Sequence, residues 1–201
     1  MPAAPRRLAS HFFAYISRLR WIKRWGLMRN AIEENVATHS WEVATLAHAL
    51  ALIHNRICDG RVNADRIAAA ALYHDATEVI TGDMPTPVKY HSRVMREAFG
   101  DIEHKAEAEL LALLPEELQE DFSPYVRESR LAEQEKQLIK AADRLSAWLK
   151  CRAELRAGNP EFAPAEKQIR ARLEEEALPE VLYFLEVFAP GYDQPLDNLL
   201  G

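Results

Sequence analysis

The chain of 201 residues contains only two cysteines, Cys58 and Cys151. Two thiols are too few for a disulfide framework or for a zinc site built on thiolates, and we expect both to be reduced and structural. Glycine is also scarce, with seven residues. The alternation of apolar and polar residues that is typical of strands is almost absent. These absences favour an all-α fold.

Long hydrophobic runs and an excess of positive charge are missing as well. No stretch approaches the roughly 20 apolar residues of a membrane span, and no small-residue cleavage site follows the N-terminal apolar patch. We therefore expect a cytoplasmic protein with no membrane partner. The 25 basic and 31 acidic residues give a net charge of −6. This charge argues against a nucleic-acid partner, because a general nucleic-acid binder presents a basic face.

What the chain does have is the composition of a globular protein, with 48% hydrophobic and 28% charged residues. Its length is sufficient for one domain with a core of its own. The helical periodicity predicts a single domain over 1–201, an all-α bundle of six to seven helices with flexible ends at about 1–7 and 193–201. The expected helices span about 8–21, 36–57, 63–80, 92–114, 131–158, 163–177 and 179–188, with a short piece that restarts at Pro115 and breaks around Ser123 and Pro124.

Four polar residues interrupt or border the apolar faces of these helices. They are a lone histidine, an adjacent His-Asp pair and a distant aspartate: His39, His74, Asp75 and Asp143. At 100° per residue, His39 heads a stripe completed by Val43, Leu46, Leu50 and Ile53. The stripe of His74 contains Ile67 and Ala71. Asp143 lies at the border of the stripe formed by Leu138, Ala142, Leu145 and Leu149.

These four side chains are ligands that a divalent cation prefers. A carboxylate or imidazole on an apolar face costs several kcal/mol unless a partner compensates it, and one cation would compensate all four. Glu78 lies one turn after the His74–Asp75 pair, so on a helix it faces the same point and is suited to act on a water. The alternative is that the histidines are satisfied core residues. The pattern alone leaves both explanations open.

Two neighbouring segments carry candidates for substrate contacts. The basic segment 21–30 contains Arg24 and Trp25; arginine grips phosphate through two hydrogen bonds, and tryptophan offers a flat wall to a sugar or base. The segment 83–90 follows the helix of Glu78, and we expect it to hang over the site. The alternatives are a solvated basic turn and a stiff Pro-Thr-Pro connection.

The order of these residues resembles a known pattern. His39, then His74-Asp75, then Asp143 is similar to the H…HD…D signature of the HD-domain metal-dependent phosphohydrolases. The stretches ENVATHSWEVATLAHALALI, YHDATEVITGDMPTPVKY and KAADRLSAWLKCRAEL resemble more closely the bacterial 5′-deoxynucleotidases of the YfbR type, over about residues 10–192. One departure is Thr38, where the family often has an acidic residue.

The resemblance implies a metal-dependent phosphoric monoester hydrolase. Such an enzyme converts deoxyribonucleoside 5′-monophosphates to deoxynucleoside and phosphate, discriminates against ribonucleotides, uses one divalent ion such as cobalt or manganese, and is a homodimer. Two alternatives stay open. One is another HD phosphohydrolase, acting on a nucleoside triphosphate or a cyclic nucleotide. The other is a non-catalytic helical module that binds nucleotide and uses the metal for stability.

The resemblance also assigns roles to residues. The implied metal ligands are His39, His74, Asp75 and Asp143. Glu78 is expected to act on the nucleophilic water, Arg24 to orient the phosphate, and Trp25 to lie against the sugar and exclude a 2′-hydroxyl. The further residues expected to contact substrate are Asp83, Met84, Pro85 and Thr86, together with the ligands His39, Asp75 and Asp143.

Overall fold

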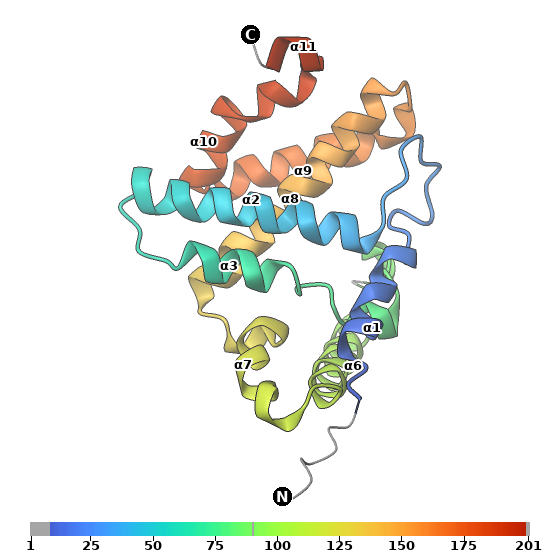
Figure 1. The fold of residues 1–201 in the computed structure, drawn as a ribbon. Helices are drawn as coiled ribbons and strands as arrows, with labels where there is room; N and C mark the ends of the chain where they lie inside the picture. The colour runs from blue at the N-terminus through green and yellow to red at the C-terminus, as the bar shows by residue number, and fades with distance from the viewer. Residues whose placement is uncertain (1–8, 90, 200–201) are drawn as a thin grey trace, which may run out of the picture.

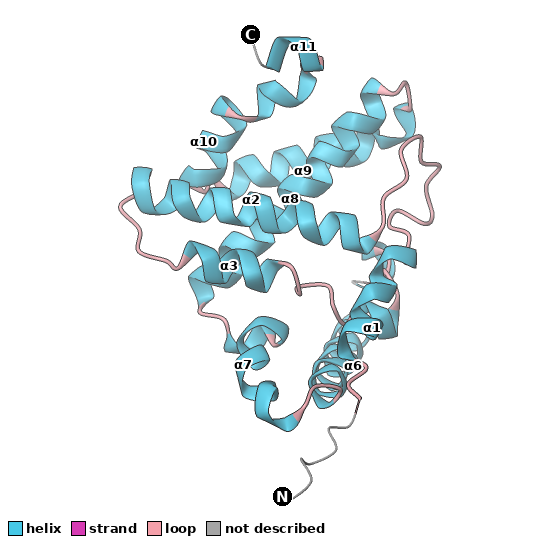
Figure 2. Cartoon of the chain, viewed as in Figure 1, coloured by secondary structure: helices cyan, strands magenta, loops and turns pink. Residues whose placement is uncertain are grey.

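The computed structural model describes residues 9–89 and 91–199, and within these ranges the secondary structure is helical apart from one isolated bridge between Lys23 and Asn35 (Figure 2). Seven α-helices have eight or more residues, in agreement with the expected six to seven: α2 (Val36–Ile57), α3 (Ala64–Ala71), α6 (Arg93–Ala112), α7 (Glu116–Val126), α8 (Glu133–Arg156), α9 (Ala163–Glu176) and α10 (Pro179–Val187). The short helices are α1 (Phe12–Ile16), α4 (Glu78–Thr81), α5 (Thr86–Lys89) and α11 (Leu196–Leu199).

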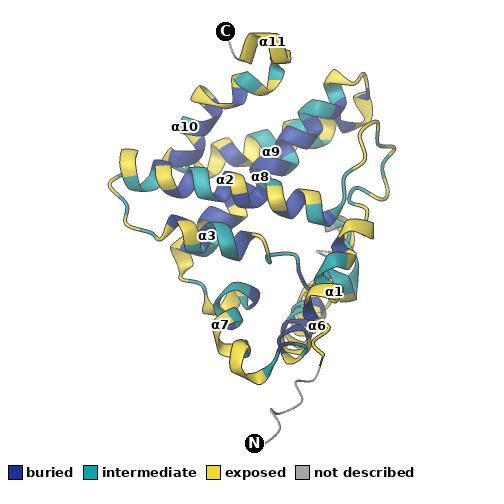
Figure 3. Ribbon diagram, in the orientation of Figure 1, coloured by how far each residue is buried: buried dark blue, intermediate teal, exposed yellow. Residues whose placement is uncertain are grey.

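Helix α2 is the centre of the larger core. Its start is fixed by Asn35, whose side chain accepts a hydrogen bond from the Thr38 backbone N–H at 3.0 Å while Thr38 Oγ1 accepts one from the Asn35 N–H. Helices α3, α8 and α10 pack against α2. The apolar stripe predicted to follow His39 on α2, from Val43 to Ile53, is buried throughout. It packs together with the buried apolar faces of α3, α8, α9 and α10 (Figure 3).

A second, smaller core lies at the end of the molecule remote from α10 and α11 (Figure 1). It is formed by α1, α6 and α7, with Phe12 completely buried against Phe122 and Tyr73. Ala76 belongs to this second core, whereas Ala71 belongs to the first. The segment 72–77 therefore passes between the two cores, and it carries His74 and Asp75.

The prediction of one continuous helix over 63–80 was wrong. Helix α3 ends at Ala71, and residues 72–77 form turns before α4 begins at Glu78. The backbone in this segment is bonded over three residues, as from the N–H of Tyr73 to the carbonyl of Ala70. Packing explains the break, because the chain leaves the first core after Ala71 and enters the second at Ala76.

Other boundaries also differ from expectation. The first expected helix is divided into α1 and a 3-10 turn over Ser17–Trp21. Helix α7 continues through Pro124 instead of breaking there, because Ser123 and Val126 are buried in the packed structure. At the expected flexible end at 193–201, the described residues contain the last residue of a 3-10 turn over Ala189–Asp193 and helix α11. The expected flexible end at 1–7 lies outside the described residues. Within the described ranges, no helix is long and apolar enough to cross a membrane.

Candidate metal centre and substrate site

Three predicted metal ligands converge on one point from separate segments. His39 in α2, His74 in the turn after α3 and Asp143 in α8 each offer a ligand atom, and these atoms lie within 4.8 Å of one another. His39 Nε2 is 3.0 Å from Asp143 Oδ1, and the two imidazole centroids are 5.3 Å apart. The Nε2 atoms of both histidines are buried without a hydrogen-bond partner in the described structure. A cation between them would satisfy both atoms.

Asp75, the fourth predicted ligand, borders the same point. Its Oδ2 atom is 3.1 Å from His74 Nε2 and 3.6 Å from His39 Nε2. The same oxygen is 3.5 Å from Arg24 Nη1. Asp75 thus connects the candidate metal centre with the arginine that the sequence suggested for phosphate binding.

The outer nitrogens of the two histidines fix the orientation of the rings. His74 Nδ1 lies 2.7 Å from the Ala71 carbonyl oxygen and donates to it. His39 Nδ1 lies 3.2 Å from Ser146 Oγ, whose own hydroxyl donates to Glu42 Oε2 at 2.5 Å. Both contacts place the ring proton on Nδ1 and leave the Nε2 lone pair directed at the shared point, as metal-binding histidines require.

The electrostatics of the cluster favour positive charge at its centre. Burial by itself lowers the pKa of His74, but Asp75 and Asp143 outweigh it and raise this pKa to about 9. Burial likewise opposes the ionisation of Asp75, yet His74, His39 and Arg24 hold its pKa well below its usual value. The pKa of Asp143 is lowered by His39 and His74 against the effect of burial. The carboxylates therefore favour positive charge at the point where a divalent cation would bind.

Glu78 has a different environment from the ligand carboxylates. It is the first residue of α4, and its Oε2 atom is buried without a hydrogen-bond partner in the described structure. Burial, reinforced by the negative charges of Asp75 and Asp83, raises the pKa of Glu78 to about 9. Asp83 also has a raised pKa, first because of burial, although Arg24 and the backbone of Trp25 oppose the shift. Glu78 is thus a carboxyl that binds a proton readily.

Arg24 and Trp25 belong to a loop over residues 22–35, here named the connector. Arg24 Nε donates to Glu34 Oε1 at 2.7 Å, and both side chains are nearly buried, at 13% and 12% exposure. The Lys23 and Arg29 side chains are 69% and 80% exposed. Lys23 and Arg29 therefore fit the alternative of a solvated basic turn. Of these three basic residues, only Arg24 faces the cluster of predicted metal ligands.

The remaining predicted substrate contacts follow Gly82. Asp83, Met84 and Pro85 are half-buried, and the Pro85 carbonyl, just before α5, accepts from the N–H groups of Val88 and Lys89 at the end of this short helix. Thr86 begins this helix, but its side chain lies outside the described part of the structure. Among the described contacts, none joins Met84 or Pro85 to the metal ligands. Their part in a substrate pocket stays a prediction.

Sequence reasoning missed three residues of the site: Glu34, Glu42 and Ser146. Glu42 lies three positions after His39, and Ser146 lies three positions after Asp143. On a helix this spacing places Glu42 beside His39 and Ser146 beside Asp143. Helical phase alone could therefore have identified both residues as neighbours of the predicted ligands. Glu34 precedes α2 and meets Arg24 through the folding back of the connector, which no local spacing reveals.

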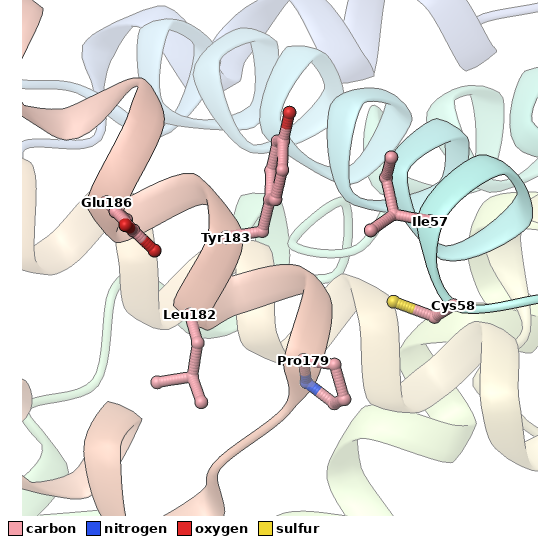
Figure 4. Close-up of a pocket in the computed structure, with 6 residues that line it drawn as sticks. All are labelled: Ile57, Cys58, Pro179, Leu182, Tyr183 and Glu186. Carbon is pink, nitrogen blue, oxygen red and sulfur yellow. The ribbon is translucent and has the colours of Figure 1, made fainter.

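A separate open pocket of about 530 Å³ lies between the end of α2 and α10, and none of the predicted metal ligands lines it (Figure 4). Its lining is mainly apolar, and it contains the thiol of Cys58 and the carboxylate of Glu186. Burial, with a contribution from Glu180, raises the pKa of the Cys58 thiol. The sulfur is therefore not activated as a nucleophile, and the pocket lacks the convergent donors of the cluster around His39.

Comparison with known proteins places the chain among relatives of similar sequence and fold. A 5′-deoxynucleotidase of Vibrio vulnificus (strain YJ016) is 50% identical over 190 residues, which cover 94% of this chain and 98% of the relative. The crystal structure of an HD-domain phosphohydrolase from Listeria innocua has a TM-score of 0.77 at 24% identity and covers 90% of this chain and 88% of that one.

A cyanophage S-2L HD phosphohydrolase, described as bound to dA and one catalytic Zn²⁺, has a TM-score of 0.61 at 20% identity, with coverages of 90% and 96%. At these identities the two solved structures establish the fold. A family model described as 5′-deoxynucleotidase YfbR-like matches residues 11–192. The chain belongs to the family of YfbR-like 5′-deoxynucleotidases.

Proposed function

We propose that this protein is a hydrolase that converts deoxyribonucleoside 5′-monophosphates to deoxynucleoside and phosphate and discriminates against ribonucleotides. The 50% identity to a 5′-deoxynucleotidase over nearly the whole chain supports the reaction. The observation that carries the proposal is the position of Arg24, whose Nη1 atom lies 3.5 Å from Asp75 Oδ2 at the edge of the cluster of His39, His74 and Asp143. A phosphate and a cation would meet between them.

The donor set fits a divalent cation such as cobalt, manganese or zinc. Two imidazoles with unpartnered Nε2 atoms and two ionised carboxylates suit these ions better than calcium, which prefers oxygen ligands alone. His39, His74, Asp75 and Asp143 would hold it. When bound, the ion supplies positive charge for the phosphoryl oxygens and lowers the pKa of water.

The protein's own residues then position the substrate. Arg24, held between Glu34 and Asp75, directs its guanidinium at the phosphate and neutralises charge that develops on its oxygens. Glu78, whose buried Oε2 has no hydrogen-bond partner in the described structure, takes the proton of the attacking water. Trp25 borders the sugar and leaves no room for a 2′-hydroxyl. Residues 83–86 complete the pocket on that side.

Phosphate release from a panel of deoxyribo- and ribonucleoside 5′-monophosphates, with added Co²⁺, Mn²⁺, Mg²⁺ or a chelator, tests this function. We expect release from the deoxyribonucleotides that depends on metal and is abolished by chelator. Tripolyphosphate from a deoxynucleoside triphosphate, or an opened cyclic ester, would identify one of the other HD reactions instead. Nucleotide binding without any product would favour the non-catalytic module.

We propose in addition that the chain is a cytoplasmic homodimer, by analogy with the family that it resembles. Light scattering coupled to size-exclusion chromatography measures the mass directly, and the chain mass of 22.9 kDa is the reference for a monomer. A mass of one chain at micromolar concentration would reject the dimer without affecting the proposed reaction.

A further inference from the structure

The far side of the connector is attached to α8 through a buried carboxylate. The Glu154 side chain is completely buried. It accepts hydrogen bonds from the backbone N–H groups of Ala31 at 2.8 Å and Ile32 at 2.9 Å, from Asn159 Nδ2 at 2.8 Å, and from Lys150 Nζ. Four donors therefore converge on one carboxylate, which is an unusually complete set for a surface loop.

The two side-chain donors of this carboxylate also bind the connector themselves. Lys150 Nζ donates to the Ile32 carbonyl, and Asn159 Nδ2 donates to the Arg29 carbonyl at 2.7 Å. Lys150, Glu154 and Asn159, here named the anchor triad, thus hold the backbone of the connector at three residues within 29–32. Each member is at most 6% exposed.

The near side of the connector carries the substrate residues. Its base is closed by hydrogen bonds from the Arg24 N–H to the Glu34 carbonyl and from the Val36 N–H to the Ile22 carbonyl, both 3.0 Å. Asn30 Nδ2 donates to the Trp25 carbonyl at 3.2 Å. A displacement of the anchored residues 29–32 would therefore be transmitted to Arg24 and Trp25 through a short, bonded loop.

Trp25 depends on this support more than an ordinary residue does. Its φ angle is 57°, in the left-handed region that costs a non-glycine residue conformational energy. Its ring packs on Phe162 at 5.3 Å, and Lys150 Nζ lies 5.5 Å from the centre of the same Phe162 ring. The anchor triad therefore contacts both the loop and the surface on which Trp25 rests.

We propose that the anchor triad is a positioning element that holds Arg24 and Trp25 against the substrate, so that it sets substrate affinity and the deoxy preference. The proposal rests on the proposed function of these two residues. The triad does not touch the metal ligands, and it acts only through the connector. Asp143, Lys150 and Glu154 are carried by the same helix, α8, and Asn159 follows its end, so the predicted ligand and the loop share one rigid support.

The test compares Glu154→Gln and the milder Asn159→Ala with the wild type. A matched control is Glu174→Gln, which makes the same chemical change in an exposed pair with Arg170 on α9. We expect Glu154→Gln to raise the KM for dAMP at least about tenfold, the effect of roughly one lost charge-assisted hydrogen bond. The kcat should change far less, the ratio of dAMP to AMP activity should fall, and metal content by elemental analysis should stay at the wild-type value.

Asn159→Ala leaves three donors on Glu154. It should therefore raise the KM for dAMP and lower the ratio of dAMP to AMP activity, each by less than Glu154→Gln does. Wild-type KM and wild-type dAMP preference in both variants, even with a lowered Tm, would overturn the proposal, since the triad would then be structural only. Loss of metal together with activity would overturn it as well.

Calorimetric binding of dAMP to chelator-treated protein separates this proposal from the proposed reaction. A wild type that binds dAMP but releases no phosphate even after Co²⁺ or Mn²⁺ is restored rejects the reaction, and the positioning proposal is then decided by the Kd. Weaker binding by Glu154→Gln than by Glu174→Gln supports it, and equal binding rejects it. If the wild type binds dAMP neither without metal nor with saturating Mn²⁺, both proposals fail.

Discussion

At the scale of single residues, the carboxyls of the site have opposite tendencies to ionise. Asp75 and Asp143 have lowered pKa values because imidazoles face them. Glu78 has a pKa raised to about 9, first by burial and then by Asp75 and Asp83. Groups whose environments separate their pKa values in this way are suited to different roles. We expect the first two to bind positive charge and Glu78 to transfer a proton.

Replacement of Glu78 by glutamine should therefore remove turnover without removing the metal. We expect kcat on dAMP to fall by about 100-fold or more, the usual contribution of a positioned acid or base, because glutamine cannot accept the proton. Elemental analysis and steady-state kinetics check the two parts. Glu97→Gln, which alters an exposed pair with Arg93 on α6, is the control. Near-wild-type turnover in Glu78→Gln would exclude an essential role for this residue.

Replacement of Trp25 by alanine should weaken the preference for deoxyribonucleotides. The indole removed is the wall assigned to C2′, so the ratio of dAMP to AMP activity should fall by about tenfold, the effect of roughly 1.4 kcal/mol of discrimination. Metal content should be unchanged. Trp21→Ala, in which the lost side chain is 64% exposed, is the control. An unchanged ratio in Trp25→Ala would assign the discrimination to another residue.

Residues of the candidate centre were predictable where chemistry and helical phase coincide. His39 was recognised because it stands on a stripe that is otherwise apolar and buried, and Asp143 was expected at the border of its helix, where its side chain is 43% exposed. Glu34 and the anchor triad were not recognised. Their meaning depends on the path of an irregular loop, which carries no periodicity.

At the scale of elements, α8 combines a predicted metal ligand, Asp143, with the support of the connector. Glu154 lies three helical turns after Asp143 on the same helix. Burial opposes ionisation of Glu154, but its hydrogen bonds from Lys150, Asn159 and two backbone N–H groups lower its pKa to about 2. The ionised form is therefore strongly favoured in the folded protein.

This shift makes Glu154 a source of acid sensitivity. A carboxyl with a folded pKa of about 2 and an ordinary value of 4.5 contributes stability above pH 4.5, and this contribution is lost as the pH falls toward 2. At pH 3 the loss amounts to roughly 2 kcal/mol. Glu154→Gln lacks this term, so between pH 7 and pH 3 its free energy of unfolding in urea should fall by less than that of the wild type. Equal falls would contradict the assignment, and Glu174→Gln should behave as the wild type.

Helix boundaries followed from the sequence where capping and burial agree. Asn35 with Thr38 marks the start of α2, and its expected range of 36–57 is the observed one. Thr38, which departs from the family's acidic residue, closes this cap instead. The break of the expected helix at 72–77 and the continuation of α7 through Pro124 were not predictable, because each is decided by contacts with the second core.

At the scale of the whole molecule, the candidate centre joins parts that are otherwise held by different cores. His39 and Asp143 come from helices of the first core, and His74 and Asp75 come from the segment between the two cores. The all-α fold class was predictable from composition and periodicity, and the structure confirms it. The division into two cores was not predictable, because an apolar stripe does not show which other helix it packs against.

Metal binding should for this reason stabilise the whole fold. A ligand present at about 100 times its Kd adds roughly 2.7 kcal/mol, so saturating Mn²⁺ should raise the Tm of chelator-treated protein by about 5 °C or more. His39→Ala should abolish this rise, whereas His48→Ala, which alters a partly exposed pair with Asp65, should retain it. Differential scanning calorimetry measures both, and an equal rise in His39→Ala would locate the bound metal elsewhere.

The sharing of α8 by Asp143 and Glu154 restricts how this protein can tolerate changes of length. Insertion of one residue between these positions would rotate everything beyond it by about 100° and shift it by about 1.5 Å along the axis. The carboxylate would then face away from the loop that it holds, although every side chain of both sites would still be present. An insertion or deletion of about two full turns would restore the helical phase. It would still displace the loop by about 10 Å along the axis of α8.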